Sequence, residues 1–113
     1  MRLVIFISGV IVLISTMGVV ADERRSSDSY YALIYDFEVA QFCGLVNRDV
    51  HDAFWQKRKM AESASPRSTE ELRQTRIKAM AAADIEYANR GLGGYKPWCA
   101  AEGRAGVARI TAP

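Results

Sequence analysis

The stretch SYYALIYDFEVAQFCG, residues Ser29 to Gly44, decides the fold of this chain. Its apolar side chains recur at helical spacing on two adjacent faces, so a helix here is apolar over more than half of its circumference. Such a helix is buried between several partners, and we expect it at the centre of the domain. Asp28 or Ser29 is suited to cap its start, and Gly44 is suited to end it in the left-handed conformation.

Two further helices are predicted downstream. Asn47 is a suitable cap for a helix RDVHDAFWQKRKMAESA, residues 48–64, whose narrow apolar stripe favours an outer position. Ser68 and Glu71 match a capping box, which begins the longest helix. This helix runs from Thr69 to about Arg90. With no strand pattern in the chain, the sequence predicts an all-α fold.

The third predicted helix carries two apolar stripes. The first contains Leu72, Arg76, Ala79, Met80, Ala83 and Tyr87. The second contains Ile77, Ala81, Ile85 and Ala88. Alanines at 79, 81, 82 and 83 would let another helix approach closely, since the distance between helix axes depends on side-chain size.

The segment NRGLGGYKPWCAAEG, Asn89 to Gly103, joins the third helix to the end of the chain. Gly91 is placed to end the third helix. Pro97 suits the first turn of a short helix, PWCAAE, which we expect Gly103 to end. The fold predicted is a small irregular bundle of three helices plus a short C-terminal helix, and residues 104–113 are predicted to be a loose tail.

The first 21 residues, MRLVIFISGVIVLISTMGVVA, match a secretory signal peptide. Val19 and Ala21 occupy the positions of a small-residue cleavage site. The apolar run is also just long enough to span a bilayer, so an uncleaved membrane anchor is the alternative. Residues 22–29 are then a flexible spacer, and residues 30–103 are the helical domain.

Cys43 and Cys99 are the only cysteines. An exported protein meets an oxidising compartment, so the sequence predicts one disulfide between them. The bond would close a loop of about 57 residues and add roughly 4 kcal/mol of stability in the chain-entropy model. Reactive thiols or a metal pair are weaker alternatives, because the chain has no C-x-x-C and no clustered second ligand.

The charge of the chain excludes some partners. The formal net charge is +2, and removal of residues 1–21 lowers it to +1 because Arg2 is lost with no acidic residue. A net charge this small indicates neither a basic surface that would bind nucleic acid nor a polybasic patch that would bind a membrane surface. A membrane is therefore a predicted partner only if residues 1–21 are retained.

No catalytic group, metal site or cofactor is predicted. His51 is the only histidine; no sequence feature brings a nucleophile to it, and we expect it on the surface. The sequence contains none of the ligand motifs, with their characteristic residue spacing, that are typical of zinc, di-iron or covalent haem sites. Asp84, on a largely apolar helix, is a candidate for a buried ion pair, because an unpaired buried charge is costly. Its candidate partners are Arg48, Arg76 and Arg90.

Two binding features remain open around the glycine-rich segment. Tyr87, Arg90, Tyr95 and Trp98 form a candidate partner-binding patch, since aromatic residues and arginine are favoured in interfaces. The competing interpretation is that these aromatic side chains cover the disulfide and belong to the core. The amides of residues 91–94 are a candidate anion site, although the run does not match a phosphate-binding loop.

The segments AADIEYANRGLGGYKPWCAAEG and DFEVAQFCGLV, with the N-terminal segment, resemble a group of small exported proteobacterial helical proteins of uncharacterised activity. The resemblance implies that the protein is exported and that the two cysteine segments pair. It implies no functional residue.

We therefore expect a non-enzymatic interaction module or accessory subunit, periplasmic or secreted, whose partner is another protein. The alternative is a single-pass accessory subunit anchored in the inner membrane. An enzyme or small-ligand binder using Asp84, Arg90 and the glycine loop is a third hypothesis.

Overall fold

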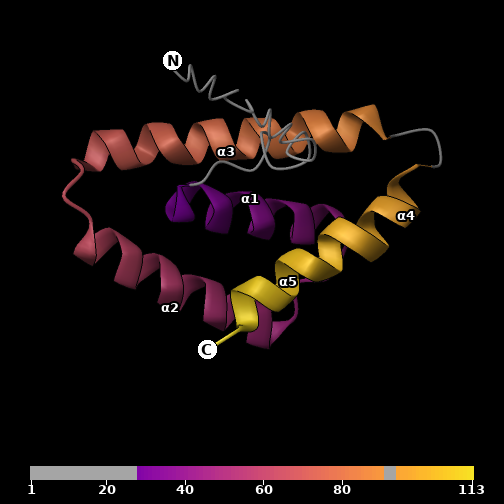
Figure 1. Ribbon diagram of the computed structural model, residues 1–113, viewed down its shortest axis with the longest axis horizontal. Coiled ribbons are helices and arrows are strands. Elements are labelled where there is room, and N and C mark those ends of the chain that lie inside the picture. Colours follow the sequence, from indigo (N-terminus) through magenta and orange to yellow (C-terminus); the bar gives the residue numbers. More distant parts are fainter. Residues whose placement is uncertain (1–27, 91–93) are drawn as a thin grey trace, which may run out of the picture.

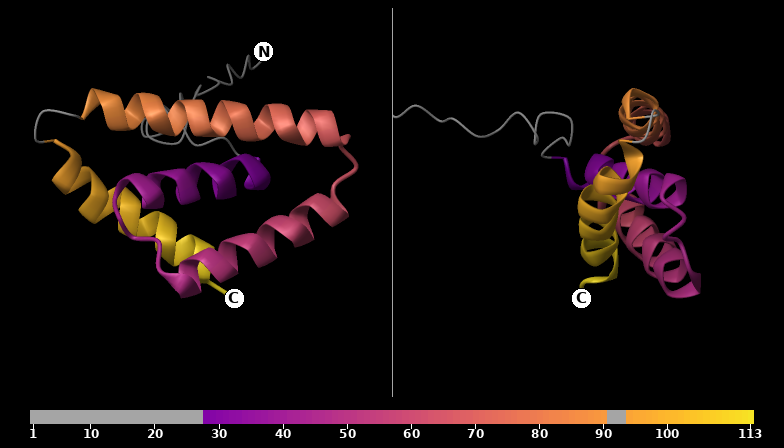
Figure 2. Two further views of the ribbon diagram at one scale, coloured as in Figure 1. Left: turned by 180° about the vertical axis from the view of Figure 1, so that it is seen from behind. Right: turned by 90° about the vertical axis from the view of Figure 1, so that its right-hand side faces the viewer.

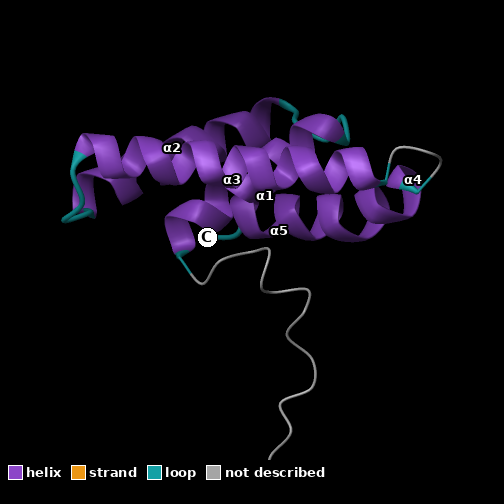
Figure 3. Ribbon diagram, turned by 90° about the horizontal axis from the view of Figure 1, so that it is seen from above, coloured by secondary structure: helices purple, strands orange, loops and turns teal. Residues whose placement is uncertain are grey.

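The structure is a computed structural model that describes residues 28–90 and 94–113. All regular elements in these ranges are helical (Figure 1, Figure 3). They are α1 (Ser29–Phe42), α2 (Arg48–Ala64), α3 (Thr69–Asn89), α4 (Tyr95–Trp98), the π-helical turn η1 (Cys99–Gly103) and α5 (Arg104–Thr111). The predicted all-α fold is confirmed. The predicted signal peptide or anchor, most of the spacer and Gly91 lie outside the described residues.

Helix α1 lies at the centre of the fold, as its broad apolar surface predicts. It contacts α2, α3, η1 and α5 (Figure 1). Its buried residues are distributed around the helix and are Tyr30, Ala32, Ile34, Tyr35, Asp36, Val39 and Ala40. By contrast, α2 buries only Val50 and Phe54, which confirms its outer position.

Local capping signals set the bounds of the first three helices. Asp28, Asn47 and Ser68 cap α1, α2 and α3 in that order. Each side-chain oxygen accepts a backbone N–H of the first turn, at 2.9, 2.9 and 3.1 Å. Gly44, with a φ of 66°, directly follows the C-cap of α1 in the left-handed region that glycine adopts without strain.

The C-terminal segment differs from the prediction. Gly103 does not end a short helix: its φ of −62° and ψ of −49° continue the backbone from η1 into α5. A Cβ at Gly103 would lie 3.0 Å from the sulfur of Cys43, and one at Gly106 would lie 3.3 Å from the Asp36 carboxylate. These glycines therefore serve close packing against α1 rather than helix termination.

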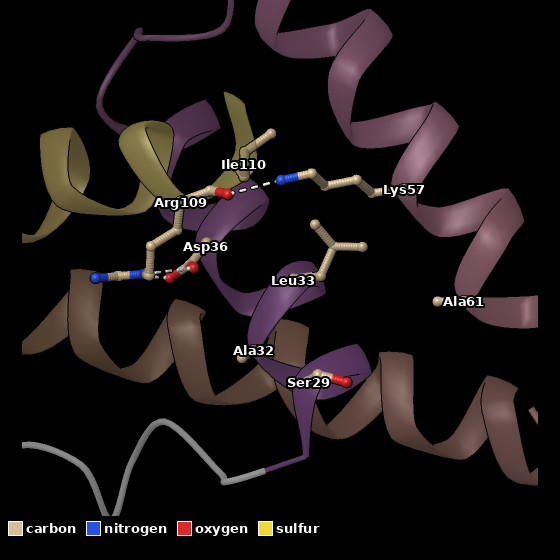
Figure 4. A pocket seen from close by; sticks show the side chains of 8 residues that line it. All are labelled: Ser29, Ala32, Leu33, Asp36, Lys57, Ala61, Arg109 and Ile110. Atoms are coloured by element: carbon tan, nitrogen blue, oxygen red, sulfur yellow. Dashed lines mark hydrogen bonds and ion pairs between the residues drawn. The ribbon is translucent and has the colours of Figure 1, made fainter. Parts of the chain in front are cut away.

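Residues 104–113, predicted to be a loose tail, instead include α5 and complete the core. Ile110 is 1% exposed. Arg109 donates from Nε and Nη2 to the two carboxylate oxygens of Asp36, both at 2.9 Å. Lys57 of α2 donates from Nζ to the backbone carbonyl of Arg109 at 2.9 Å (Figure 4). It also donates to the carbonyl of Ala112 at 2.6 Å, so it pairs two of the carbonyls at the end of α5.

The predicted disulfide between Cys43 and Cys99 is confirmed. It joins the end of α1 to the start of η1 with 5.4 Å between the Cα atoms. The core that forms around α1 consists of Tyr30, Ile34, Tyr35, Val39, Val50, Phe54, Leu72, Ala79, Ala83, Trp98 and Ile110. No helix within residues 28–90 and 94–113 has both the length and the apolar run needed to cross a membrane.

Candidate functional site

Helix α3 packs against α1 through one of its two apolar stripes. Leu72, Ala79 and Ala83 are 6%, 0% and 0% exposed and lie in the core. The small side chains of the two alanines allow the close approach to α1 that the sequence predicts. This packing against α1 covers only one side of α3.

The other stripe is exposed. We call its residues, Ile77, Ala81, Ile85 and Ala88, the outer face of α3. Ile77 is 47% and Ile85 is 60% exposed. Helix α3 lies at the margin of the molecule in both views of Figure 2, and none of the described elements covers this face. Ile77 and Ile85 lie about two helical turns apart on this exposed stripe, and the small side chains of Ala81 and Ala88 lie on the same stripe.

Two opposite charges border the outer face. Lys78 and Asp84 are both exposed, and neither forms an ion pair within residues 28–90 and 94–113. Glu38 of α1 lies close enough to Asp84 to be affected by it. Burial raises the pKa of Glu38 above its ordinary 4.5, and the negative charge of Asp84 raises that pKa further. This edge of the outer face therefore carries two carboxyl groups that repel each other.

The structure brings the predicted patch residues together, but Trp98 is buried and Tyr87 is partly buried. Trp98 is 5% exposed and belongs to the core. The ring of Tyr87 lies 6.3 Å from that of Trp98 and 6.4 Å from that of Tyr95. The guanidinium of Arg90 lies 5.8 Å from the Trp98 ring. Only Tyr95, 40% exposed, and the Arg90 side chain, also 40% exposed, reach solvent substantially.

The prediction of a buried ion pair at Asp84 is wrong, because Asp84 is exposed. The buried acidic residues are Asp36 and Glu86, at 3% and 5% exposure. Asp36 is paired with Arg109, and Glu86 accepts from Nη2 of Arg90 at 3.2 Å. Arg90, one of the three candidate partners of Asp84, therefore pairs with Glu86 instead.

Two other titratable side chains among the described residues are His51 and Tyr35. His51 is exposed, as predicted, and its Nδ1 lies 3.2 Å from Oδ1 of Asp52. Burial, followed by the charges of nearby acidic groups, raises the pKa of Tyr35 to about 12, so this phenol stays protonated at neutral pH. No group of three or more His, Cys, Asp or Glu side chains suited to a metal ion occurs among the described residues.

Two of the open clefts on the surface are lined by described residues. The first, about 290 Å³, lies between α1, α2 and α5 (Figure 4). Its polar side chains include Asp36, Arg109 and Lys57, which already bond to one another or to backbone carbonyls. The second, about 270 Å³, lies beside the disulfide and is lined in part by Phe42 and Tyr95. The polar groups of the first cleft are already paired, whereas the second cleft is also lined by the basic side chains of Lys96 and Arg104.

Comparison with known proteins finds no matching family model, no similar curated protein and no similar solved structure.

Proposed function

We propose that the protein is a non-enzymatic, exported helical module that binds another protein through the outer face of α3. The observation that carries the proposal is the exposed pair Ile77 and Ile85 on a stripe that no described element covers. Exposed apolar patches on a folded protein often mark sites that bind another protein.

The size of the stripe fits a reversible association. Ile77 and Ile85 keep 47% and 60% of their surface in water, so burial of this exposed surface by a partner contributes about 1 kcal/mol for each. Ala81 and Ala88 add little apolar area, but they let a partner helix approach closely. Met80, 41% exposed, flanks the stripe and can extend the contact. The whole face would contribute several kcal/mol before the cost of association.

The disulfide supports the exported part of the proposal. The bond between Cys43 and Cys99 is of the kind that persists in oxidising compartments and is rare in the cytosol. The intact mass of the protein from its native host tests this. A chain that begins at Asp22 supports release into the periplasm or beyond, and a chain that keeps residues 1–21 supports the anchored accessory subunit instead.

The binding role is tested with a matched pair of variants. Ile85→Glu places a charge on the outer face, whereas Met60→Glu places the same charge on α2 at a residue that is 65% exposed. Size-exclusion chromatography of the native extract, with the tagged full chain at its normal expression level, is expected to show a complex larger than the single chain. Ile85→Glu should dissociate this complex and Met60→Glu should not. Three identical profiles at the mass of one chain would contradict the proposal.

A further inference from the structure

The cleft beside the disulfide lies where two distant parts of the chain meet. The end of α1 and the loop after it supply Phe42 and Leu45, and the last helical segment supplies Tyr95, Lys96, Ala100 and Arg104. The disulfide links these two parts and also lines the cleft, whose volume is about 270 Å³. The lining therefore combines apolar and aromatic side chains with basic ones.

The apolar walls of the cleft are held in place by the fold. The ring of Phe42 is stacked on that of Tyr87 with 4.5 Å between their centroids, and the ring of Tyr95 lies 6.4 Å from the same Tyr87 ring. Leu45 packs against Gly103, where an added Cβ would lie 3.1 Å from Cδ1 of the leucine. A preformed site of this kind favours binding, because few side chains must be ordered when the ligand enters.

Lys96 and Arg104 are the charged side chains of this cleft, and both lack an ion-pair partner. Neither forms an ion pair or a side-chain hydrogen bond within the part of the chain that the structure describes. The described lining contains no acidic residue, and Glu102, two residues before Arg104, is not part of it. In the first cleft, by contrast, the guanidinium of Arg109 is bound to Asp36. An anion entering the second cleft would meet two cations without displacing an existing partner.

The two cations lie on one side of the last helical segment. Helix α4, η1 and α5 follow one another without a break from Tyr95 to Thr111 (Figure 1). Lys96 and Arg104 lie four residues on either side of Ala100, and all three line the cleft. The small methyl group of Ala100 leaves space between the two longer side chains. One acidic group placed over Ala100 can therefore bind both cations.

The size of the cleft limits the ligand. At about 30 Å³ for each non-hydrogen atom, the share of a water molecule in the liquid, the cleft holds roughly nine such atoms. That is room for one six-membered ring and one acidic group. A flat ring suits the walls formed by Phe42 and Tyr95, because contacts between aromatic rings add to the burial of apolar area. The planar guanidinium of Arg104 matches the geometry of a carboxylate.

From this combination we propose that the cleft binds a free small aromatic carboxylate, with its acidic group between Lys96 and Arg104 and its ring against Phe42 and Tyr95. The inference goes beyond the proposed function and is independent of it, because the cleft shares no residue with the outer face of α3. It adds a small-molecule site to a protein-binding module.

Titration of the ¹⁵N-labelled full chain with phenylacetate, followed by the amide NMR shifts, is the first test. Saturable shifts are expected at residues 42–45 and 95–104, with a dissociation constant on the order of 1 mM for a ligand of this size. Phenylacetamide keeps the ring but lacks the charge, and inorganic phosphate keeps a charge but lacks the ring. Each should bind at least about tenfold more weakly than phenylacetate. The absence of saturable shifts at these residues, or equal binding of either analogue, overturns the proposal.

Removal of one cation at a time tests the charge contacts. Lys96→Gln and Arg104→Gln should each weaken phenylacetate binding about tenfold, because each removes one charge-assisted hydrogen bond. Lys59→Gln, at an exposed residue of α2, removes the same charge elsewhere and should leave binding unchanged. The binding of phenylacetamide should be the same in all of these proteins, which an unfolded variant would not reproduce. An equal loss of phenylacetate binding in Lys59→Gln would overturn the local contact.

Two neighbouring alanines test the position of the ligand. Ala100→Leu fills the space between the cations and should lower the affinity for phenylacetate about tenfold. Ala101→Leu adds the same atoms at an exposed residue that does not line the cleft, and it should leave the affinity unchanged. Both residues are exposed, so both variants are expected to fold, and circular dichroism checks this. Equal affinities of the two variants would overturn the placement over Ala100.

A peptide that ends in phenylalanine separates a free ligand from the C-terminus of a protein, because it presents the same ring and carboxylate on a longer chain. Phenylacetate should bind at least as tightly as the peptide, and tighter binding of the peptide would overturn the assignment to a free small molecule. Ile85→Glu should leave phenylacetate binding unchanged, since Ile85 does not line the cleft. Failure of the cleft to bind any probe would therefore leave the proposed function standing, and loss of protein binding in Ile85→Glu would leave the cleft unaffected.

Discussion

Replacing Ile110 by alanine is expected to lower the free energy of unfolding by about 3 kcal/mol. Ile110 is 1% exposed and lies in the core beside the cleft between α1, α2 and α5. The change removes three carbon atoms, worth roughly 2.4 kcal/mol at about 0.8 kcal/mol for each buried methylene. The cavity that remains raises the total to about 3 kcal/mol. For a domain of this size the melting temperature should fall by roughly 12–24 °C.

Urea unfolding followed by far-UV circular dichroism, with the disulfide intact, measures this loss. Met60→Ala on α2 is the matched control: Met60 is 65% exposed, so its loss should change stability by less than about 0.5 kcal/mol. Ile110→Val should fall between the two, at about 1 kcal/mol. If Ile110→Ala and Met60→Ala unfolded at the same urea concentration, residues 104–113 would be the loose tail that the sequence predicts, and the packing of α5 described above would be refuted.

Three further perturbations follow from other parts of the fold. Replacing Cys43 and Cys99 together by serine should cost roughly 4 kcal/mol, seen as a lower urea midpoint than that of the oxidised parent; equal midpoints would contradict the role of the bond. Gly103→Ala gains about 1 kcal/mol of helix propensity, but crowding against Cys43 costs about 1–3 kcal/mol, so a lower melting temperature is expected and a higher one would show that the contact yields. Burial raises the pKa values of Asp28 and Glu62, but hydrogen bonds, chiefly from arginine side chains, outweigh burial and hold them below 3.8 and 4.5. Carboxylates with lowered pKa values add stability above their unfolded pKa, so the free energy of unfolding should decline as the pH falls below about 4.5, and Asp28→Asn with Glu62→Gln should flatten that decline in acid titrations of unfolding.

The bounds of the first three helices could be predicted because their signals are local. Asn47 and Ser68 each bind an amide only three residues away, so the cap and the helix it begins lie within one short stretch of sequence. Gly44 ends α1 through its own backbone conformation, with no distant contact involved. The disulfide was predictable for a different reason, since a chain with two cysteines has only one possible internal pairing.

The C-terminal segment could not be predicted because its glycines act at long range. Gly103 resembles a helix terminator when only its neighbours are considered, but Gly103 and Gly106 both lie where a side chain would crowd residues of α1 or of its C-terminal end. The partners are distant in sequence: Asp36 and Arg109 are separated by 73 residues. Periodicity and local residue spacing give no indication of a contact between residues so far apart in the sequence.

Part of the candidate site could be predicted from the sequence. Both apolar stripes of α3 follow from the spacing of their residues, but the spacing does not tell which stripe is covered. The error at Asp84 has a geometric cause. Its neighbour Ala83 is 0% exposed, yet successive residues on a helix point about 100° apart, so Ala83 faces α1 while Asp84 faces solvent.

The position of α5 against α1 also determines the order in which the domain can fold during synthesis. Helix α1 emerges from the ribosome before the other described helices, whereas α5, which supplies Ile110 to the core and Arg109 to Asp36, emerges after all of them. Until then, the nascent chain lacks both the last apolar contact and the guanidinium partner of a buried carboxylate. Native packing is therefore expected only after translation has passed Ile110, and the nascent chain should remain open to chaperones until that point.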